Sequence, residues 1–347
     1  MPRITTLFIK EQIDPEGLAS AAAVVIDVFL STTTIVTVLE RGACRVHPAP
    51  GPDAARAMAR QLGPGTVLLG GEEQGLPVAG FDRGPFPHEY APEDVAGRTV
   101  IFTSTNGTRA MHRARTARPL LLACLRNAPA TAAYLRRVNP ERLYLIACGS
   151  RARLALEDLL CAGLIAALFY REGTVCDDAT WLAMDFARRH LGPLDALGER
   201  SVGGHGGEGR GQDPGSGGAG RWGNGGPAPA QARERVPTHG ERVVVPPSGQ
   251  GGPGALGCEA VRALVPPAAG GRHPDQEPPG PPSPPDAGSA GAVARAALAV
   301  LRVSRTGRAL AAGDPGDELL AFAAAIGASS TVVCLEDGWA RRLEPAG

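Results

Sequence analysis

Short apolar runs alternate with segments of helical periodicity from residue 1 to about residue 197, and this alternation constrains the fold most strongly. The runs predicted to be strands cover residues 21–30, 44–50, 66–72, 99–105, 119–125 and 142–149. Helices are predicted between and after them, most clearly over residues 53–63, 127–138 and 154–172. Strands that are apolar along their whole length are typical of a sheet covered on both faces. The sequence therefore predicts an α/β fold, with a mainly parallel sheet in a three-layer α/β/α arrangement.

A Gly/Pro-rich segment, residues 198–290, interrupts this pattern. From residue 199 to residue 290 the chain holds 23 of its 47 Gly and 16 of its 32 Pro, without a sustained period of 2 or 3.6. Such a segment buries too little apolar surface to offset the entropy of ordering it, so we expect a disordered insert. GC-rich DNA translated in a shifted frame yields the same residue types, and that origin stays open as an alternative.

Periodicity returns at about residue 291. A helix is predicted from there to about residue 304, a second helix over 317–327, and a closing strand over 330–338. These helices and this strand are of the same kind as the alternating helices and strands of residues 1–197. We therefore expect residues 1–197 and 291–347 to form one domain, with 198–290 as an insert within it.

The overall composition excludes several classes of protein. The formal net charge is zero, whereas nucleic-acid and membrane-surface binding favour a basic chain. We find no apolar run of about 18 residues and no signal-peptide layout, so we expect a cytoplasmic protein that does not enter membranes. The seven Cys form no CxxC pair and are expected to be reduced. The single Lys, Lys10, stands against 34 Arg, which indicates GC-rich coding DNA. A homodimer is expected only from the prevalence of twofold symmetry.

Polar side chains gather directly after the predicted strands. They are Asp27 with residues 31–34, Glu72 and Glu73, residues 103–109, Arg126 and Asn127, and residues 150–153 with Glu157 and Asp158. Parallel sheets bind ligands at the carboxyl ends of their strands, so these groups are expected at one edge. Helix N-termini and hydroxyl groups suit an anion, and carboxylates suit Mg²⁺. A metal that neutralises phosphate charge and activates water gives a phosphatase.

Each of these features also has a purely structural interpretation. The stretch TSTNGTR is a good helix cap, since Ser, Thr and Asn cap helices routinely. Asp27 is costly to bury within VVIDV unless backbone donors satisfy it. The acids of LALEDLL are open to solvation on a helix surface. Function and structure therefore remain alternatives for each motif taken alone.

Taken together and in order, the motifs resemble the 2-phosphosulfolactate phosphatase family, the Mg²⁺-dependent enzymes of coenzyme M biosynthesis. The matching stretches are VVIDVFLSTTTIV, GGEEQGLPVAGFDRGPFPHEY, TVIFTSTNGTRAM, CLRNAPATA, IACGSRARLALEDLLCAG and CDDAT. They span residues 20 to about 190. The stretch GRALAAGDPGDELLAFAA is similar to the C-terminal part of the family.

The resemblance implies a three-layer α/β/α fold and hydrolysis of a phosphorylated, sulfonated hydroxy acid to sulfolactate and phosphate. The partner would be a small anionic phosphorylated substrate, and the cofactor Mg²⁺. The implied catalytic residues are Asp27, Glu72 and Asp158, of which Asp27 and Glu72 would bind the metal. The implied substrate-binding residues are Thr32, Thr33, Asn106, Gly107, Thr108, Arg109 and Asn127.

Two positions depart from the family pattern. Leu30 and Glu73 stand where the family usually has Arg, the residue suited to a bidentate grip on phosphate or sulfonate. Two alternatives therefore stay open beside the phosphatase. One is a catalytically impaired relative that binds a small anion or a partner. The other is a metal-dependent hydrolase for a less anionic substrate.

Overall fold

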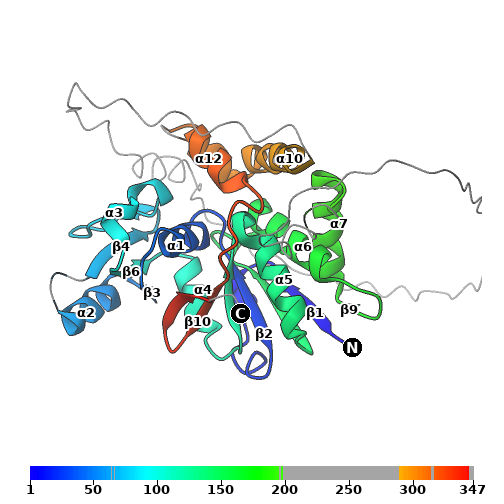
Figure 1. Ribbon diagram of the computed structural model, residues 1–347, viewed down its shortest axis with the longest axis horizontal. Helices are drawn as coiled ribbons and strands as arrows, with labels where there is room; N and C mark the ends of the chain where they lie inside the picture. The colour runs from blue at the N-terminus through cyan, green and yellow to red at the C-terminus, as the bar shows by residue number, and fades with distance from the viewer. Residues whose placement is uncertain (64, 66, 195–196, 198–288, 314–315, 344–347) are drawn as a thin grey trace, which may run out of the picture. The chain divides into compact units, whose positions relative to one another are not determined.

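A single sheet of eleven strands organises the part of the chain described by the computed structural model, which comprises residues 1–63, 65, 67–194, 197, 289–313 and 316–343 (Figure 1). All of these residues belong to one compact unit. The expected disordered insert lies outside the described residues, apart from its last two positions. Those two begin a helix.

The strands and helices follow the predicted alternation closely. The strands are β1 (Arg3–Leu7), β2 (Ala22–Ile26), β3 (Arg45–Ala49), β4 (Val67–Glu73), β5 (Leu76–Pro77), β6 (Thr99–Thr103), β7 (Leu120–Ala123), β8 (Arg142–Ala147), β9 (Val175–Cys176), β10 (Val333–Glu336) and β11 (Trp339–Arg342). The α-helices are α1 (Ser31–Glu40), α2 (Pro52–Leu62), α3 (Pro92–Val95), α4 (Gly107–Arg113), α5 (Ala128–Val138), α6 (Leu156–Phe169), α7 (Asp178–Leu191), α10 (Ser289–Val303), α11 (Arg305–Ala311) and α12 (Gly316–Ala324). Short 3₁₀ helices are η1 (Lys10–Gln12), η2 (Pro87–Glu89) and η3 (Leu125–Asn127).

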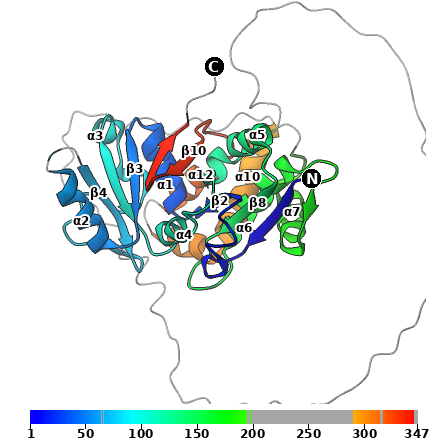
Figure 2. The same ribbon diagram turned by 90° about the horizontal axis from the view of Figure 1, so that it is seen from below.

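The sheet consists of two parallel groups joined by an antiparallel hairpin. Its order is β5-β4-β6-β3-β11-β10-β7-β2-β8-β1-β9. Strands β3, β4 and β6 are parallel in one group, and β7, β2, β8, β1 and β9 are parallel in the other. The hairpin β10–β11 pairs antiparallel with β7 on one side and β3 on the other. Figure 2 shows this red hairpin between the two groups, so the predicted, mainly parallel sheet is confirmed.

Strand β2 shows why helices cover both faces of the sheet. All five of its residues are buried, and alternate side chains enter different cores. Val24 and Ile26 pack in the core that includes α5, α6 and α7, whereas Ala23 and Val25 pack in the core that includes α1 and α4. A strand buried on both faces needs a helix layer on each side, which confirms the three-layer α/β/α arrangement.

Four strands of the sheet, β1, β5, β9 and β11, have no counterpart among the strands expected from the sequence. Strand β1 was not expected because its sequence RITTL contains only two apolar residues, and it buries only Ile4 and Thr6. The closing strand expected over 330–338 is instead the first half of the hairpin. Asp337 and Gly338 both have positive φ, as the central residues of a type I′ turn require.

None of the helices in the described part of the chain combines the length and apolar character needed to cross a membrane.

Helices α6 and α7 pack so closely that Gly163 has no room for a side chain. A Cβ at this position would lie 1.9 Å from the Ala183 carbonyl oxygen. We predict that Gly163→Ala destabilises the protein by about 1–3 kcal/mol, the usual cost of overpacking. Urea denaturation followed by circular dichroism measures the loss. The matched control is Gly51→Ala, since a Cβ at Gly51 meets nothing within 4 Å. Equal midpoints for the two variants would contradict the prediction.

Candidate functional site

A cavity of about 910 Å³ opens at the carboxyl ends of β2, β4 and β6. Of the site residues that the family resemblance implies, Asp27, Glu72, Asn106 and Arg109 line it. Other polar residues expected at the strand ends line it as well: Ser31, Ser104, Thr105, Ser150 and Arg151. Residues from η1, from the loop after β8 and from α11 complete the wall. The cavity thus lies at the carboxyl ends of strands from both parallel groups, the end at which parallel strands commonly bind ligands.

Asp27 is the buried acid of this cavity, with 4% of its surface exposed. The Ser31 hydroxyl donates to Asp27 Oδ2 at 2.7 Å, and Ser31 Oγ also lies 2.7 Å from Ser104 Oγ. Ser104 Oγ accepts from the Thr108 backbone N–H at 3.1 Å, which caps α4. This chain of hydroxyls joins the ends of β2 and β6.

Gly107 allows α4 to approach Asp27. A Cβ at this position would lie 2.6 Å from Asp27 Oδ2 and 2.5 Å from Ser31 Oγ. Any side chain there would displace the carboxylate or the hydroxyl. The predicted Gly in the TNGTR motif is therefore explained by close packing against the acid.

Burial raises the pKa of Asp27 to about 6. The Ser31 hydroxyl and the Gly107 backbone N–H lower the pKa, while the charges of Glu72 and Glu157 raise it. Asp27 therefore gains and loses its proton near neutral pH. A carboxyl group with such a pKa is suited to proton transfer.

Asp158 occupies a different place from the one that its motif suggested. Its carboxylate accepts the backbone N–H groups of Val28 at 2.8 Å and Gly149 at 3.0 Å, and it does not line the cavity. Burial, followed by the charges of Asp27 and Glu157, raises the pKa of Asp158 well above its usual range. Asp158 thus fixes the loops after β2 and β8, next to the acid that lines the cavity.

Glu157 lies under α11 and is 2% exposed. Burial raises its pKa, and hydrogen bonds from the Thr306 and Ser304 side chains lower it. Its Oε2 atom is buried without a hydrogen-bond partner among the described residues. Glu157 therefore connects helix α11, which lines the cavity, to the buried acids Asp27 and Asp158.

Glu72 lines the cavity and also organises the loops around it. Its carboxylate accepts the Thr105 backbone N–H at 2.6 Å, the Thr105 hydroxyl at 2.9 Å and the Gly75 N–H at 2.7 Å. These donors fix its orientation toward the cavity. Each carboxylate oxygen can accept more than one bond, so Glu72 keeps capacity for a further ligand.

Four predicted substrate-binding side chains bond to the backbone at the strand ends. The Thr32, Thr33 and Thr108 hydroxyls donate to the carbonyls of Asp27, Val28 and Ser104, each at 2.8 Å. Asn127 accepts from Cys124 N–H and donates to the carbonyls of Leu122 and Thr331. These four residues do not line the cavity, and their role in substrate binding stays a prediction.

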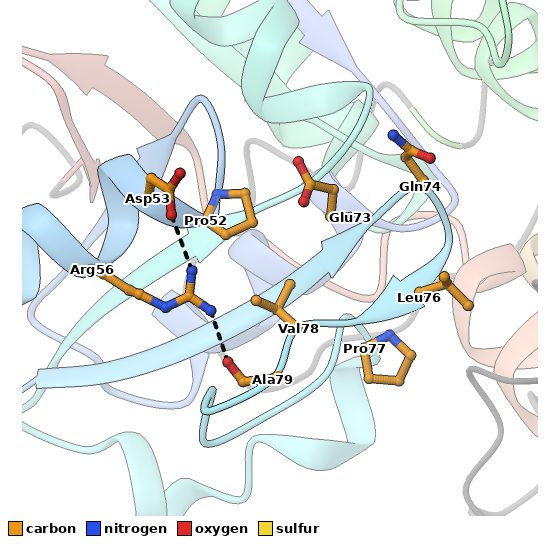
Figure 3. Close-up of a pocket in the computed structure, with 9 residues that line it drawn as sticks. All are labelled: Pro52, Asp53, Arg56, Glu73, Gln74, Leu76, Pro77, Val78 and Ala79. Carbon is orange, nitrogen blue, oxygen red and sulfur yellow. Dashed lines mark hydrogen bonds and ion pairs between the residues drawn. The ribbon is translucent and has the colours of Figure 1, made fainter.

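The two positions that depart from the family pattern lie at the edge of the cavity. Leu30 lines it, and Glu73 forms an ion pair with Arg109 in which the nitrogen and oxygen are 3.7 Å apart. Glu73 also borders a second hollow of about 440 Å³ beside the β4–β5 hairpin (Figure 3). The Arg in that hollow, Arg56, bonds to Asp53 and to the Ala79 carbonyl. The larger cavity is therefore the better candidate for an anion.

The sequence motifs missed most of the cations at the cavity. Its wall includes Lys10, Arg109, Arg151, Arg305 and Arg308, against the acids Glu11, Asp27 and Glu72. Lys10 follows the unpredicted strand β1. Arg305 and Arg308 are three residues apart on α11, the spacing that places two side chains on one helix face. This spacing is the only feature of the local sequence that could have indicated that Arg305 and Arg308 lie together at a site.

The carboxylates of the site fit a bound Mg²⁺. Within the described residues, none of Asp27, Glu72, Glu157 and Asp158 forms an ion pair with Lys or Arg. The same residues contain no group of three or more His, Cys, Asp or Glu arranged around one point. Mg²⁺ is commonly held by one or two carboxylates, with waters and substrate oxygens as the other ligands. Asp27 and Glu72 both line the cavity and could supply these one or two carboxylates.

The raised pKa of Asp27 predicts how stability depends on pH. Between pH 3.8 and about 6 the folded state keeps a proton that the unfolded state releases. The stabilisation from this proton is complete at low pH and lost as pH rises through about 6. We predict that the Asp27→Asn variant does not lose this stabilisation as pH rises, because Asn does not titrate. Its stability relative to the native protein should rise by about 2 kcal/mol from pH 4 to pH 7, at about 1.36 kcal/mol per pKa unit.

Urea denaturation in EDTA at several pH values measures this difference. The chelator keeps divalent cations from contributing to the native protein alone. Parallel stability curves for the two proteins over this range would contradict the raised pKa.

Comparison with known proteins identifies the family. The family model for 2-phosphosulpholactate phosphatase matches residues 7–205. Proteins named "Probable 2-phosphosulfolactate phosphatase" from Deinococcus radiodurans and Symbiobacterium thermophilum are 41% and 39% identical to this chain, over 53% and 52% of its length and 76% and 78% of theirs. A protein of the same name from Thermus thermophilus is 38% identical over 50% of this chain and 72% of its own. The chain with this acid-and-hydroxyl cavity thus belongs to the 2-phosphosulfolactate phosphatase family.

Proposed function

We propose that the protein is a Mg²⁺-dependent phosphatase that hydrolyses 2-phosphosulfolactate, or a related phosphorylated hydroxy acid, to the hydroxy acid and phosphate. The observation that carries the proposal is Asp27, a buried carboxyl with a pKa of about 6 in a cavity that five cationic side chains line. The names of the relatives agree with this reaction.

The reaction adds water to phosphorus and breaks the ester P–O bond. Asp27 carries the proton: its carboxylate accepts a proton from the attacking water, with Ser31 fixing its orientation through Oδ2. Asp27 then passes this proton to the ester oxygen, which leaves as the hydroxyl group of the hydroxy acid. Ionised Asp27 predominates above pH 6, so this step is favoured at neutral pH. Bound Mg²⁺ would neutralise phosphate charge and lower the pKa of water, with Asp27 and Glu72 as its candidate ligands.

The remaining wall of the cavity suits a substrate with several negative charges. The cations Arg109, Arg151, Arg305 and Arg308 can each donate to phosphate, carboxylate or sulfonate oxygens. Phe29 and Leu30 add an apolar portion to the wall. Such a portion keeps part of the substrate away from water, which strengthens the charged contacts.

A phosphate-release assay with 2-phosphosulfolactate tests the proposal. We expect release with Mg²⁺, its loss in EDTA, and a kcat lowered about 10²–10⁴-fold by Asp27→Asn, because a positioned proton acceptor contributes that much. Asp53→Asn is the matched control, since Asp53 is an exposed acid outside the cavity. No release from this ester or from other phosphorylated hydroxy acids would refute the phosphatase.

The same assay across esters with fewer negative charges separates the alternative hydrolase. Faster turnover of a substrate that lacks the sulfonate would assign the protein to that class. Equal loss of activity in Asp27→Asn with both substrates would place both reactions in this cavity.

The impaired-relative alternative rests on Leu30 and on the Glu73–Arg109 ion pair, which engages a cation needed for the anion. The variant Leu30→Arg with Glu73→Arg adds two cations and frees Arg109. We expect the native protein to be active and the variant to lower KM about tenfold or more, since a hydrogen bond to a charged group contributes about 1.5–3 kcal/mol. Activity found only in the variant would identify the native chain as the impaired form.

A further inference from the structure

Lys10 is the single lysine of the chain, and it lines the cavity. Its ammonium group donates to Glu11 Oε1 at 2.8 Å and to Asn106 Oδ1 at 2.9 Å. The side chain is only 13% exposed, so these bonds form in a sheltered place. Lys10 begins η1, which follows β1, so it reaches the cavity from a sheet strand that pairs with β8.

The Asn106 side chain bonds to Lys10 and does not cap helix α4. It is the N-cap residue of α4, where an Asn side chain normally accepts from the backbone of the first turn, yet it makes no such bond. Ser104 caps the helix instead, by accepting from Thr108 N–H. Asn106 therefore orients the ammonium group. The next residue, Gly107, is the one that packs against Asp27.

The ammonium group retains one donor for a ligand. A lysine ammonium has three N–H donors, and two of them have partners among the described residues. Both partners converge on one nitrogen atom, a geometry that suits a compact ammonium and not the planar fork of Arg. In a chain that uses Arg at all 34 other basic positions, this site keeps Lys.

We propose that Lys10 determines substrate specificity by binding an anionic oxygen of the substrate with its third N–H. The inference rests on the proposed function only in calling the anion a substrate. The anionic oxygen belongs either to the phosphate group or to the carboxylate or sulfonate of the same molecule. The experiment below has separate arms for these two sources.

The lysine count makes a direct test feasible. An amine-reactive acetylating reagent modifies only Lys10 and the N-terminal α-amine of the full-length protein, and mass spectrometry resolves the two. We expect saturating phosphate or sulfolactate to slow acetylation of Lys10 about tenfold, while the α-amine serves as the internal control. Protection by phosphate alone places the phosphate group at Lys10, and protection by sulfolactate alone places the carboxylate or sulfonate there.

Two outcomes of the labelling would overturn the inference. The first is an equal rate of Lys10 acetylation in the presence and absence of both anions. The other is Lys10 that stays unreacted in their absence, because its ammonium is then closed to ligands. Neither outcome depends on turnover, so protection without phosphate release would refute only the phosphatase.

Kinetics of matched variants separates binding from a structural role. We expect Lys10→Met to raise KM about tenfold or more with little change in kcat, and Lys10→Arg to restore only part of the affinity. Arg113→Met is the control, because Arg113 donates to the carbonyls of Glu11 and Ile13 at the same turn but does not line the cavity. An equal rise in KM for Arg113→Met would reduce Lys10 to a stabiliser of η1, and an unchanged KM in Lys10→Met would exclude its contact with substrate.

Discussion

The hairpin β10–β11 is the contact on which the rest of the structure depends, because it joins two parallel groups of strands into one sheet. Val333 and Cys334 pair with β7, and Ala340 pairs with Val46 of β3. Asp27 follows β2 in one group, whereas Glu72 lies at the end of β4 and Ser104 follows β6 in the other. The hairpin therefore sets how the carboxyl ends of the two groups meet. The Ser31–Ser104 contact of 2.7 Å closes the join on the side of the cavity.

Burial of acids without cationic partners is the main electrostatic feature of the site. Asp27, Glu157 and Asp158 are each at most 4% exposed, and their charges act on one another. Unpaired buried carboxylates are costly, so the folded protein retains protons on them that the unfolded chain would release. A cation that replaced those protons would recover part of this cost. The burial that raises the pKa of Asp27 would thus also favour the divalent cation proposed for this site.

Local patterns in the sequence predicted the layered fold and the position of the acids. Uniformly apolar runs such as β2 are recognisable because both of their faces are buried, and Asp27 is conspicuous at the end of such a run. Strand β1 was missed because two of its residues are polar threonines. The pairing of β10 with β7 was beyond sequence patterns, because contacts between distant segments fix it. The dipeptide Asp337-Gly338, which is typical of a hairpin turn, was the local feature from which the β10–β11 hairpin could have been predicted.

The residue types at the site were easier to predict than their roles. Asp27, Glu72, Asn106 and Arg109 do meet at one cavity, although β2 belongs to one parallel group of strands and β4 and β6 belong to the other. A Thr hydroxyl, by contrast, bonds readily to the backbone four or five residues earlier, and Thr32 and Thr33 do so here. Sequence alone does not separate that use from ligand binding. Lys10 was missed together with β1, the strand that positions it.

The cations of the cavity lie outside the two positions, 30 and 73, that were expected to hold Arg. Leu30 leaves the end of β2 apolar, and Glu73 engages Arg109. Positive charge reaches the cavity from Lys10 near one end of the chain and from Arg305 and Arg308 in the C-terminal part. Glu157 links α11 to the buried acids through Thr306 and Ser304, and the charge of Arg305 on the same helix lowers the pKa of Glu157. The anion binding proposed for this cavity would therefore depend on the packing of α11, which supplies Arg305 and Arg308 to its wall.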